Sequence, residues 1–456
     1  MKLILIFPRM IHTSGDPPLG IGSIAAYVKK HTDAEVSILD TTFHPSYEYV
    51  YKKLKREKPD AIGIYVDTIM HNNAFKIAQI AKKLGIFVIT GGPHTTVMPE
   101  TMQKFSDMIV IGEGEITIKE VIQNFEKKRF NSIKGIWYKK NKTWFKNPAR
   151  EPIHNLDSLE FPALDLMEME NYIQIWHSLD SFDPSLRGTN IIASRGCPYN
   201  CSYCQPNLKA IFGEKFRSRS PEHVVAELKE LKNKFKIDAF FLHDDTFNIS
   251  KVWVNKFCDL LDKEKINLLW SCNSRVNTLT DKKMVQRMYD SGLRMIHIGV
   301  ESGSQRILNE IYRKGIKLSD VPIVIDQANK IGIKTLAFFM LGAPTETIKE
   351  IKQTINFAVS LNATEITASI TNPLPGTKLL DVMKDKYKIS KNFGDFDYYT
   401  KRAFEDPDLS YKQLKKYQKI LLFRFYTHPK RWGYILKHFT SIKGLKKMWL
   451  KVKRFL

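Results

Sequence analysis

Three cysteines stand close together in the segment 194–205, at Cys197, Cys201 and Cys204. Their spacing, Cys-x-x-x-Cys-x-x-Cys, brings three thiolates to one small inorganic centre, and no fourth cysteine lies nearby. A [4Fe-4S] cluster normally takes four cysteine thiolates. A set of three therefore predicts an iron-sulfur cluster with one open iron, and an open coordination position is typical of catalytic metal sites.

Two other uses of the cysteine motif stay open. A structural zinc site needs a fourth cysteine or histidine at short spacing, and the next candidate along the chain, His223, lies well beyond that spacing. A disulfide is disfavoured because the chain has five cysteines and no secretory signal, which indicates a reducing cytosol. The remaining Cys258 and Cys272 lie in apolar segments and are expected to be buried as small hydrophobic residues.

The cysteine motif, with the aromatic Tyr203 directly before its last cysteine, resembles the radical S-adenosylmethionine (radical SAM) family. The resemblance implies that the open iron chelates the amino and carboxylate groups of SAM. It also implies that an electron from the cluster cleaves SAM into methionine and a 5′-deoxyadenosyl radical. The catalytic and metal-binding residues expected on this basis are Cys197, Cys201 and Cys204.

Ahead of the cysteines, apolar strands alternate with amphipathic helices, the pattern of a parallel α/β domain. The expected strands are 3–8, 36–40, 61–66, 87–90 and 108–111. The expected helices are 21–30, 47–57, 73–84 and 116–128. These elements predict a doubly wound, Rossmann-like sheet over residues 1–130, and ligands of such sheets bind at the carboxyl ends of the strands.

The loops at those strand ends carry glycines and polar residues, namely Pro17-Pro-Leu-Gly20, Asp67-Thr68, Gly91-Gly-Pro-His94 and Gly112-Glu-Gly-Glu115. In this order they resemble the N-terminal cobalamin-binding domain of one large radical SAM subgroup, that of the anaerobic magnesium-protoporphyrin cyclase and hopanoid-type enzymes. The resemblance implies a corrin ring over the carboxyl edge of the sheet. Its expected contacts are Gly20, Thr68, Gly91, Gly92, His94, Gly112, Glu113, Gly114 and Glu115.

A lower axial ligand for the corrin is less well indicated. Many cobalamin proteins supply a histidine through Asp-x-His-x-x-Gly after the first strand, and His12 and Gly15 have that spacing. Met10 replaces the aspartate, however, and a metal-bound histidine usually needs a carboxylate or carbonyl partner. An ordinary loop histidine is therefore favoured over an axial ligand at His12.

Residues 131–188 are expected to form a connector with a short strand at 135–138, and residues 189–380 return to an alternation of strands and helices. The expected strands are 191–194, 239–243, 268–272, 295–300, 335–341 and 365–370. The expected helices are 221–235, 250–263, 281–291, 304–311, 318–331 and 345–361. Six such units after a cysteine loop resemble the partial (β/α)6 barrel of radical SAM enzymes, whose active site lies at the carboxyl ends of the strands.

Polar residues follow the barrel strands, at positions where a strand buried in the core would be followed by apolar residues. SAM is a zwitterion that also carries a ribose and an adenine. Its pocket therefore needs hydrogen-bond acceptors, a cationic side chain and backbone that can approach the ligand closely. By family position, Arg275 is expected to pair with the methionyl carboxylate and Glu301 to accept from ribose or amino groups. An ion pair between Arg275 and Glu301 is the alternative. The expected SAM-binding residues are Tyr203, Asp244, Asp245, Asn273, Arg275, Glu301, Gly342 and Pro344.

More than half of the formal charge of +23 lies at the end of the chain, in the region 381–456. From Tyr411 onward there are fourteen lysines and arginines and no acidic residue, and helices are expected at 411–426 and 442–455. A basic amphipathic helix with Trp449 and Phe455 on its apolar face is typical of interfacial membrane binding. Packing of that face on the barrel is the alternative, and nucleic acid is the least favoured partner.

No run of about eighteen uncharged apolar residues appears, so a transmembrane helix is not expected. The sequence predicts a cytoplasmic protein, with peripheral contact at the inner face of the membrane.

Together these features predict a cobalamin-dependent radical SAM enzyme with a [4Fe-4S] cluster, SAM and cobalamin as cofactors. Methylation of an unactivated carbon of a hydrophobic small molecule or lipid is the favoured reaction, and ferredoxin or flavodoxin is the expected kind of electron donor. A cyclase or oxidase of a tetrapyrrole or lipid is the alternative within the same architecture. An iron-sulfur redox-sensing or binding protein is the alternative from a different class.

Overall fold

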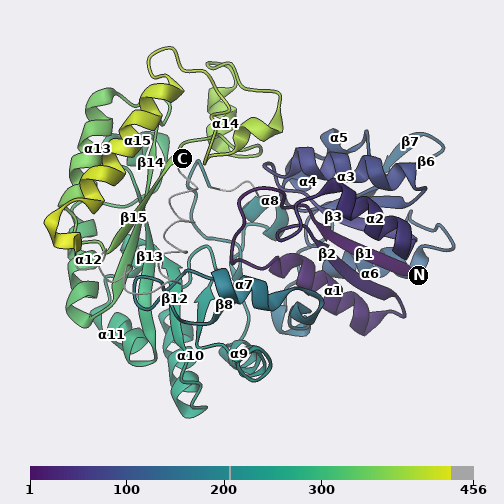
Figure 1. The fold of residues 1–456 in the computed structure, drawn as a ribbon, viewed down its shortest axis with the longest axis horizontal. Helices are drawn as coiled ribbons and strands as arrows, with labels where there is room; N and C mark the ends of the chain where they lie inside the picture. Colours follow the sequence, from purple (N-terminus) through teal and green to yellow (C-terminus); the bar gives the residue numbers. More distant parts are fainter. Residues whose placement is uncertain (205–206, 433–456) are drawn as a thin grey trace.

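The computed structural model describes residues 1–204 and 207–432. The described chain forms two α/β units that lie side by side, with the N-terminal unit on the right of Figure 1 and the barrel on the left. None of the described helices is long and apolar enough to cross a membrane. The helix expected at 442–455 lies outside the described residues.

The N-terminal sheet has the strand order β2-β1-β3-β4-β5-β6-β7. Its parallel strands are β1 (Lys2–Phe7), β2 (Glu35–Asp40), β3 (Ala61–Tyr65), β4 (Phe87–Gly91) and β5 (Met108–Val110). Because side chains alternate along a strand, Leu3 and Leu5 share a core with α1 (Leu19–His31) and α6 (Glu115–Asn124). Ile4 and Ile6 share the other core with α2 (Tyr47–Glu57) and α3 (His71–Lys83). The predicted doubly wound sheet is confirmed.

Two antiparallel strands extend this sheet past residue 130. β6 (Ile136–Lys140) pairs with β5, and β7 (Thr143–Lys146) pairs with β6. The strand expected at 135–138 between the domains is therefore part of the N-terminal sheet. The short helices α4 (Pro93–Val97) and α5 (Pro99–Met102) were not predicted, because they are too short to show a helical period.

The connector holds η1 (Leu156–Ser158), η2 (Leu164–Leu166) and α7 (Met169–Ile175), and it ends at the buried Trp176. The indole ring lies against Gly188, where an added Cβ would overlap the ring. The first barrel strand, β8 (Gly188–Ile191), begins at this glycine, which pairs with Ala239, and so starts earlier than the strand expected at 191–194.

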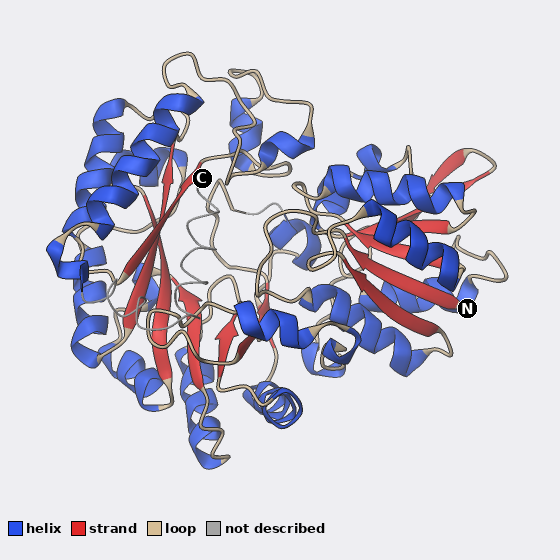
Figure 2. Ribbon diagram, viewed as in Figure 1, coloured by secondary structure: helices blue, strands red, loops and turns tan. Residues whose placement is uncertain are grey.

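The second sheet has the strand order β15-β14-β13-β12-β11-β8, and all neighbours are parallel. The remaining strands are β11 (Ala239–Leu242), β12 (Leu269–Ser274), β13 (Leu293–Glu301), β14 (Lys334–Leu341) and β15 (Glu365–Ile370). Figure 2 shows helices along the outside of this sheet: α9 (Pro221–Phe235), α10 (Lys251–Lys263), α11 (Lys282–Asp290), α12 (Asp320–Ile331) and α13 (Ile348–Ser360). This open arrangement confirms the predicted partial barrel.

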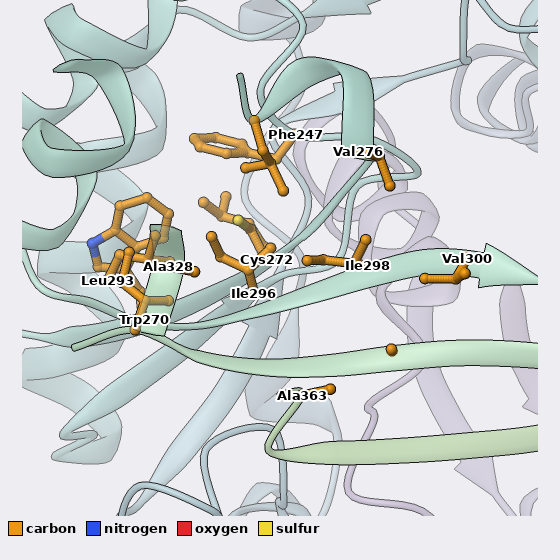
Figure 3. Packing of buried hydrophobic residues seen from close by; sticks show 14 of the residues in the cluster. Phe247, Trp270, Cys272, Val276, Leu293, Ile296, Ile298, Val300, Ala328 and Ala363 are labelled. Carbon is orange, nitrogen blue, oxygen red and sulfur yellow. The ribbon is translucent and has the colours of Figure 1, made fainter. Parts of the chain in front are cut away.

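The barrel core lies between the sheet and the outer helices. Trp270, Cys272 and Ile296 pack together there with Phe247, as Figure 3 shows. Cys258 and Cys272 are both fully buried, as expected. The helix expected at 304–311 is partly a π-helix, η4 (Ile307–Ile311).

The described C-terminal part holds α14 (Lys378–Met383), η5 (Phe393–Phe396), α15 (Tyr411–Tyr426) and η6 (Pro429–Arg431). α15 lies beside α13 on the outside of β15, with Leu414 and Phe425 fully buried (Figure 1). The segment around η5 returns to the N-terminal unit, where His12 Nε2 lies 2.8 Å from Asp397 Oδ2. This segment ties the barrel to the N-terminal unit.

Candidate active site

The cysteine loop begins directly after the short strand β9 (Ser194–Arg195), which pairs with β10 (Arg217–Ser218). Gly196 turns the chain with a φ of 85°, a conformation that favours glycine. Cys197, Cys201 and Cys204 follow as partly exposed cysteines that form no disulfide among the described residues. The loop therefore presents three accessible sulfur donors at the mouth of the barrel.

The cysteine loop supplies thiolates as its donors. Cysteine thiolates are the usual ligands of an iron-sulfur cluster, and three of them come from this one loop. The residues present therefore fit the predicted cluster. Within the described residues, no three His, Cys, Asp or Glu side chains form a group that could hold a single metal ion.

Arg275 lies against the cysteine loop, directly after β12. Its Nη1 is 3.2 Å from Cys201 Sγ, and its guanidinium carbon lies 3.7 Å from the centroid of the Tyr199 ring. Its Nη2 donates to the carbonyl of Lys314. The nitrogens expected to hold the SAM carboxylate thus contact Cys201 and Lys314, and the alternative of a pair with Glu301 is wrong.

Glu301 pairs with Lys314 instead. It ends β13 at a shift of register against β14, with a φ of 71°. Its Oε1 accepts from Lys314 Nζ at 2.8 Å and from the Tyr203 hydroxyl at 3.1 Å, and Lys314 Nζ lies 2.9 Å from the same hydroxyl. Burial, with the charge of Glu301 second, raises the pKa of Tyr203. Tyr203 and Glu301 are thus brought together, through a lysine that sequence reasoning missed.

Asp244 supports the chain just ahead of the cysteine loop. Its Oδ1 accepts from the backbone nitrogens of Ala193 at 2.7 Å and Ser194 at 3.1 Å. Burial raises the pKa of Asp244 to about 6, and burial together with the charge of Asp244 raises the pKa of Asp245 to about 7. Asn273 Nδ2 donates to the Asp244 carbonyl at 3.0 Å. The three predicted residues therefore lie together at the ends of β11 and β12.

The turn after β14 is fixed from two sides. The N–H of Gly342 donates to Glu346 Oε2 at 2.6 Å, and Arg402 Nη2 donates to the Gly342 carbonyl at 3.1 Å. Gly342 has a φ of 82°, and an added Cβ would lie 2.5 Å from Leu414 of α15. The contact of Gly342 and Pro344 with SAM stays a prediction.

A cavity of about 450 Å³ lies between the N-terminal sheet and the barrel. At one end it reaches Leu5, Gly63 and Val110 in the N-terminal unit, and at the other it is lined by Ser194 and Asp245. The predicted cobalamin contacts in its wall are Gly20, Gly91, Gly92, Gly112, Glu113, Gly114 and Glu115. Of the residues predicted to bind SAM, Asp244 and Asp245 therefore face the same space as most of the predicted cobalamin contacts.

Two glycines of this wall, Gly20 and Gly112, face open space. An added Cβ on Gly20 would meet no atom within 4 Å, and on Gly112 the nearest atom would be the Ile211 carbonyl at 3.8 Å. Apolar side chains, among them Leu208 and Ile211, complete the wall. A large, mostly apolar ring approached by backbone suits such a lining. The residues present fit the predicted corrin.

The two glutamates of the wall form ion pairs with the barrel. Arg195 bridges them, with Nη1 2.6 Å from Glu113 Oε1 and Nη2 2.5 Å from Glu115 Oε1. Arg217 lies 3.1 Å from the other oxygen of Glu113. Burial alone would raise the pKa of Glu115, but the pair with Arg195 lowers it. Because Arg195 stands two residues before Cys197, this network joins the two predicted cofactor loops.

Thr68 and His94 do not belong to the described cavity wall, and both are buried. His94 Nδ1 lies 3.1 Å from the Thr68 hydroxyl, and His94 Nε2 lies 3.1 Å from that of Thr101. Burial lowers the pKa of His94 to about 3. Their contacts with cobalamin stay predictions. His12 also lies outside this wall, and its Nε2 bonds to Asp397, so its role as an ordinary loop histidine stays a prediction.

A second hydrogen-bonded group at the cavity, which sequence reasoning missed, centres on Asn190. The indole N–H of Trp176 can only donate, and it donates to Asn190 Oδ1 at 2.9 Å. The Asn190 amide must then donate to Asp16 Oδ1 at 2.7 Å and to His243 Nδ1 at 3.3 Å. A neutral His243 therefore carries its proton on Nε2. Because His243 lines the cavity, this N–H can donate to a ligand there.

Comparison with known proteins decides the family. Residues 191–358 match the model of the Radical SAM superfamily, and residues 15–122 match that of the B12 binding domain. An uncharacterized methyltransferase of Pyrococcus horikoshii is 32% identical to this chain, over 98% of each of the two. This chain belongs to the cobalamin-dependent radical SAM methyltransferase family.

Two further similarities agree with the family. The anaerobic magnesium-protoporphyrin IX monomethyl ester cyclase of Rubrivivax gelatinosus is 28% identical, over 88% of this chain and 72% of its own. The solved structure of the radical SAM methyltransferase TsrM from Kitasatospora setae, with cobalamin and a [4Fe-4S] cluster bound, superposes with a TM-score of 0.69 at 17% identity, over 84% of this chain and 75% of its own. The chain is thus a radical SAM enzyme whose cofactors are a [4Fe-4S] cluster, SAM and cobalamin.

Proposed function

We propose that this radical SAM enzyme transfers a methyl group from SAM to an unactivated carbon of a hydrophobic small molecule or lipid. In such a reaction the cluster and SAM supply a 5′-deoxyadenosyl radical, and the corrin supplies the methyl group. The observation that carries the proposal is the shared cavity, which joins the Gly112 loop to Ser194 and Asp245. Methyl donor and substrate radical must meet at contact distance, and one shared space gives that proximity.

The residues beside the cysteine loop have distinct tasks in this proposal. Arg275 places a positive charge next to Cys201, and Lys314 holds the Glu301 carboxylate in one position at 2.8 Å. This carboxylate would accept from the amino group or ribose of SAM. Asp245, with a pKa of about 7, can take up or release a proton near neutral pH, as general acid–base chemistry requires.

His243 gives the cavity a directed hydrogen-bond donor. Asn190 fixes the imidazole through Nδ1, so Nε2–H is the group that His243 can offer to a bound molecule. It would bind an oxygen or unprotonated nitrogen of the substrate and thereby orient the carbon to be methylated.

The chemistry of the wall supports a hydrophobic substrate. On the barrel side, Ile192 and the side chains of Leu208, Ile211 and Phe212 from α8 (Asn207–Phe212) form an apolar part of the wall. Charged side chains, among them Arg219 and Asp245, lie in the same wall. The apolar part can take lipid or tetrapyrrole carbon, and the charged part can meet a polar group of the same molecule. The relative from Rubrivivax gelatinosus, whose name states a magnesium-protoporphyrin ester, supports the same class.

The test follows the methyl group. The enzyme is reconstituted anaerobically with iron, sulfide and hydroxocobalamin, and dithionite stands in for the ferredoxin or flavodoxin that we propose as electron donor. SAM with a deuterated methyl group is added together with a lipid extract or a mixture of protoporphyrins. We expect label in the corrin fraction and in a product of one mixture. Formation of 5′-deoxyadenosine with no label leaving SAM would contradict methyl transfer.

A cyclase or oxidase reaction on a tetrapyrrole or lipid is the second candidate, which the similarity to the cyclase favours. It would use the same cavity and radical but leave the methyl group of SAM in place. An unlabelled product with fewer hydrogens than its precursor, formed together with 5′-deoxyadenosine, would support this candidate.

A further inference from the structure

The outer side of α15 carries a row of three lysines and a phenylalanine. Lys412, Lys416, Lys419 and Phe423, here called the α15 row, follow one another at spacings of three or four residues and so share one side of the helix. All four side chains are exposed. The opposite side of α15 is buried against the barrel, so the α15 row points away from the protein.

The charge of the α15 row is not compensated within the described chain. Tyr411 to Trp432 includes no aspartate or glutamate, and no ion pair to the three lysines occurs among the described residues. Like charges three or four residues apart destabilise a helix. Burial lowers the pKa of Lys415 on the same helix, and the nearby charge of Lys419 is the second cause. An anionic partner would remove this repulsion.

Two aromatic side chains mark the carboxyl end of the α15 row. Phe423 is 69% exposed and Trp432, just after η6, is 57% exposed. The indole N–H donates to the Thr427 carbonyl at 3.1 Å, which keeps the ring at the surface. Lysines beside exposed Phe and Trp are typical of a bilayer interface, where ring carbons enter the headgroup region and ammonium groups meet phosphates.

This surface lies away from the cofactor cavity. α15 starts near the turn at Gly342, which contacts Leu414, and ends near the loop before β15, where Arg431 donates to the Leu361 carbonyl. Its carboxyl end is therefore at the amino ends of the barrel strands, opposite the cysteine loop. In Figure 1 the yellow ribbon reaches the left edge of the molecule, far from the N-terminal unit.

We propose that the α15 row and Trp432 dock the enzyme on the surface of a bilayer that contains anionic lipid. Residues 433–456 add seven lysines and arginines and no acidic residue, so their charge favours the same partner. Nucleic acid is the other common polyanion. Proteins that bind it without sequence preference, however, hold its backbone in a positively charged groove. The α15 row is a single line on a convex helix. The proposal is independent of the methyl-transfer reaction.

The test measures co-sedimentation of the full chain with vesicles of phosphatidylcholine alone or of phosphatidylcholine with phosphatidylglycerol. The variant Lys412→Gln/Lys416→Gln/Lys419→Gln removes the charge of the α15 row, and Phe423→Ser/Trp432→Ser removes its aromatic end. A matched control, Lys55→Gln/Lys282→Gln/Lys283→Gln, removes the same charge from exposed lysines of α2 and α11.

We expect binding to the anionic vesicles only. At about fivefold in affinity per lysine, the α15 triple variant should bind roughly 100-fold more weakly, while the control stays close to the original chain. The aromatic variant should lose the binding that remains at high salt. Equal losses in both triple variants, or no binding to anionic vesicles, would overturn the proposal. So would tighter binding to duplex DNA than to these vesicles. Circular dichroism checks that all variants are folded.

Discussion

Gly299 lies directly beneath the buried pair of Glu301 and Lys314. An added Cβ at this position would lie 2.5 Å from Glu301 Oε1 and 2.7 Å from Lys314 Nζ. A side chain at residue 299 would therefore displace the flexible ends of this pair. At the scale of single residues, the geometry of the proposed SAM site thus depends on a glycine as much as on the charged groups.

Gly299→Ala is therefore expected to shift the ends of Glu301 and Lys314 and to lower the free energy of unfolding by about 1 kcal/mol, because a methyl group is added to a filled site. Chemical denaturation measures this loss. Gly91→Ala is the control, since its Cβ would meet only Val110 Cβ at an ordinary 3.5 Å. Equal losses in the two variants would contradict the account of Gly299.

Glu346 predicts a pH dependence of stability. Burial raises its pKa from 4.5 to about 7, although the Gly342 N–H donates to it. Between these values the folded chain binds more protons than the unfolded chain, so stability falls as pH rises from about 4.5 to 7. Glu346→Gln cannot ionise, and it should be more stable than the original chain by up to about 3 kcal/mol at pH 8 and nearly equal at pH 5. Thermal unfolding at the two pH values checks this, and a difference independent of pH would contradict it.

At the scale of elements, β9 and the loop after β5 are joined by Arg195. Its two terminal nitrogens bind Glu113 and Glu115, and all three side chains are largely buried. Arg195→Met is expected to cost about 3 kcal/mol, because it leaves glutamates buried without this partner. The matched control is Arg187→Met, which removes an exposed pair with Glu170 and should cost less than about 1 kcal/mol. Chemical denaturation compares the two, and equal losses would show that Arg195 does not hold the units together.

The start of α1 tests the corrin side of the cavity. Gly20→Val places a side chain where an added Cβ meets no atom within 4 Å, so the fold should not change. The side chain would occupy cavity space, and we expect hydroxocobalamin to bind roughly tenfold more weakly or worse. Equilibrium dialysis measures the affinity. An unchanged affinity for hydroxocobalamin would contradict a corrin site beside Gly20.

Much of the fold could be predicted because local signals agreed. The helices expected at 47–57, 221–235 and 411–426 have those bounds, and each is preceded by a serine that caps its amino end. The strand expected at 191–194 begins earlier, at Gly188. There the strand is extended by parallel pairing of Gly188 with Ala239, which the apolar pattern does not reveal.

The site was less predictable because its contacts join distant segments. The cysteines carry their signal in their spacing, but Lys314 looks like any lysine of a polar loop until the fold places it 2.8 Å from Glu301. Asn190 and His243 meet across two strands in the same way. Such residues could be found from sequence only through their tertiary partners.

At the scale of the whole molecule, the central claim is that one cavity between two units serves both cofactors. The direct measurement uses the chain reconstituted anaerobically with iron, sulfide and hydroxocobalamin, then given SAM and dithionite. Bound corrin, read from its absorption spectrum, and 5′-deoxyadenosine are quantified in the same sample. Cys201→Ala serves as the matched variant. We predict both signals in the original chain, and corrin without 5′-deoxyadenosine in the variant. Formation of 5′-deoxyadenosine without bound corrin in the original chain would contradict the claim.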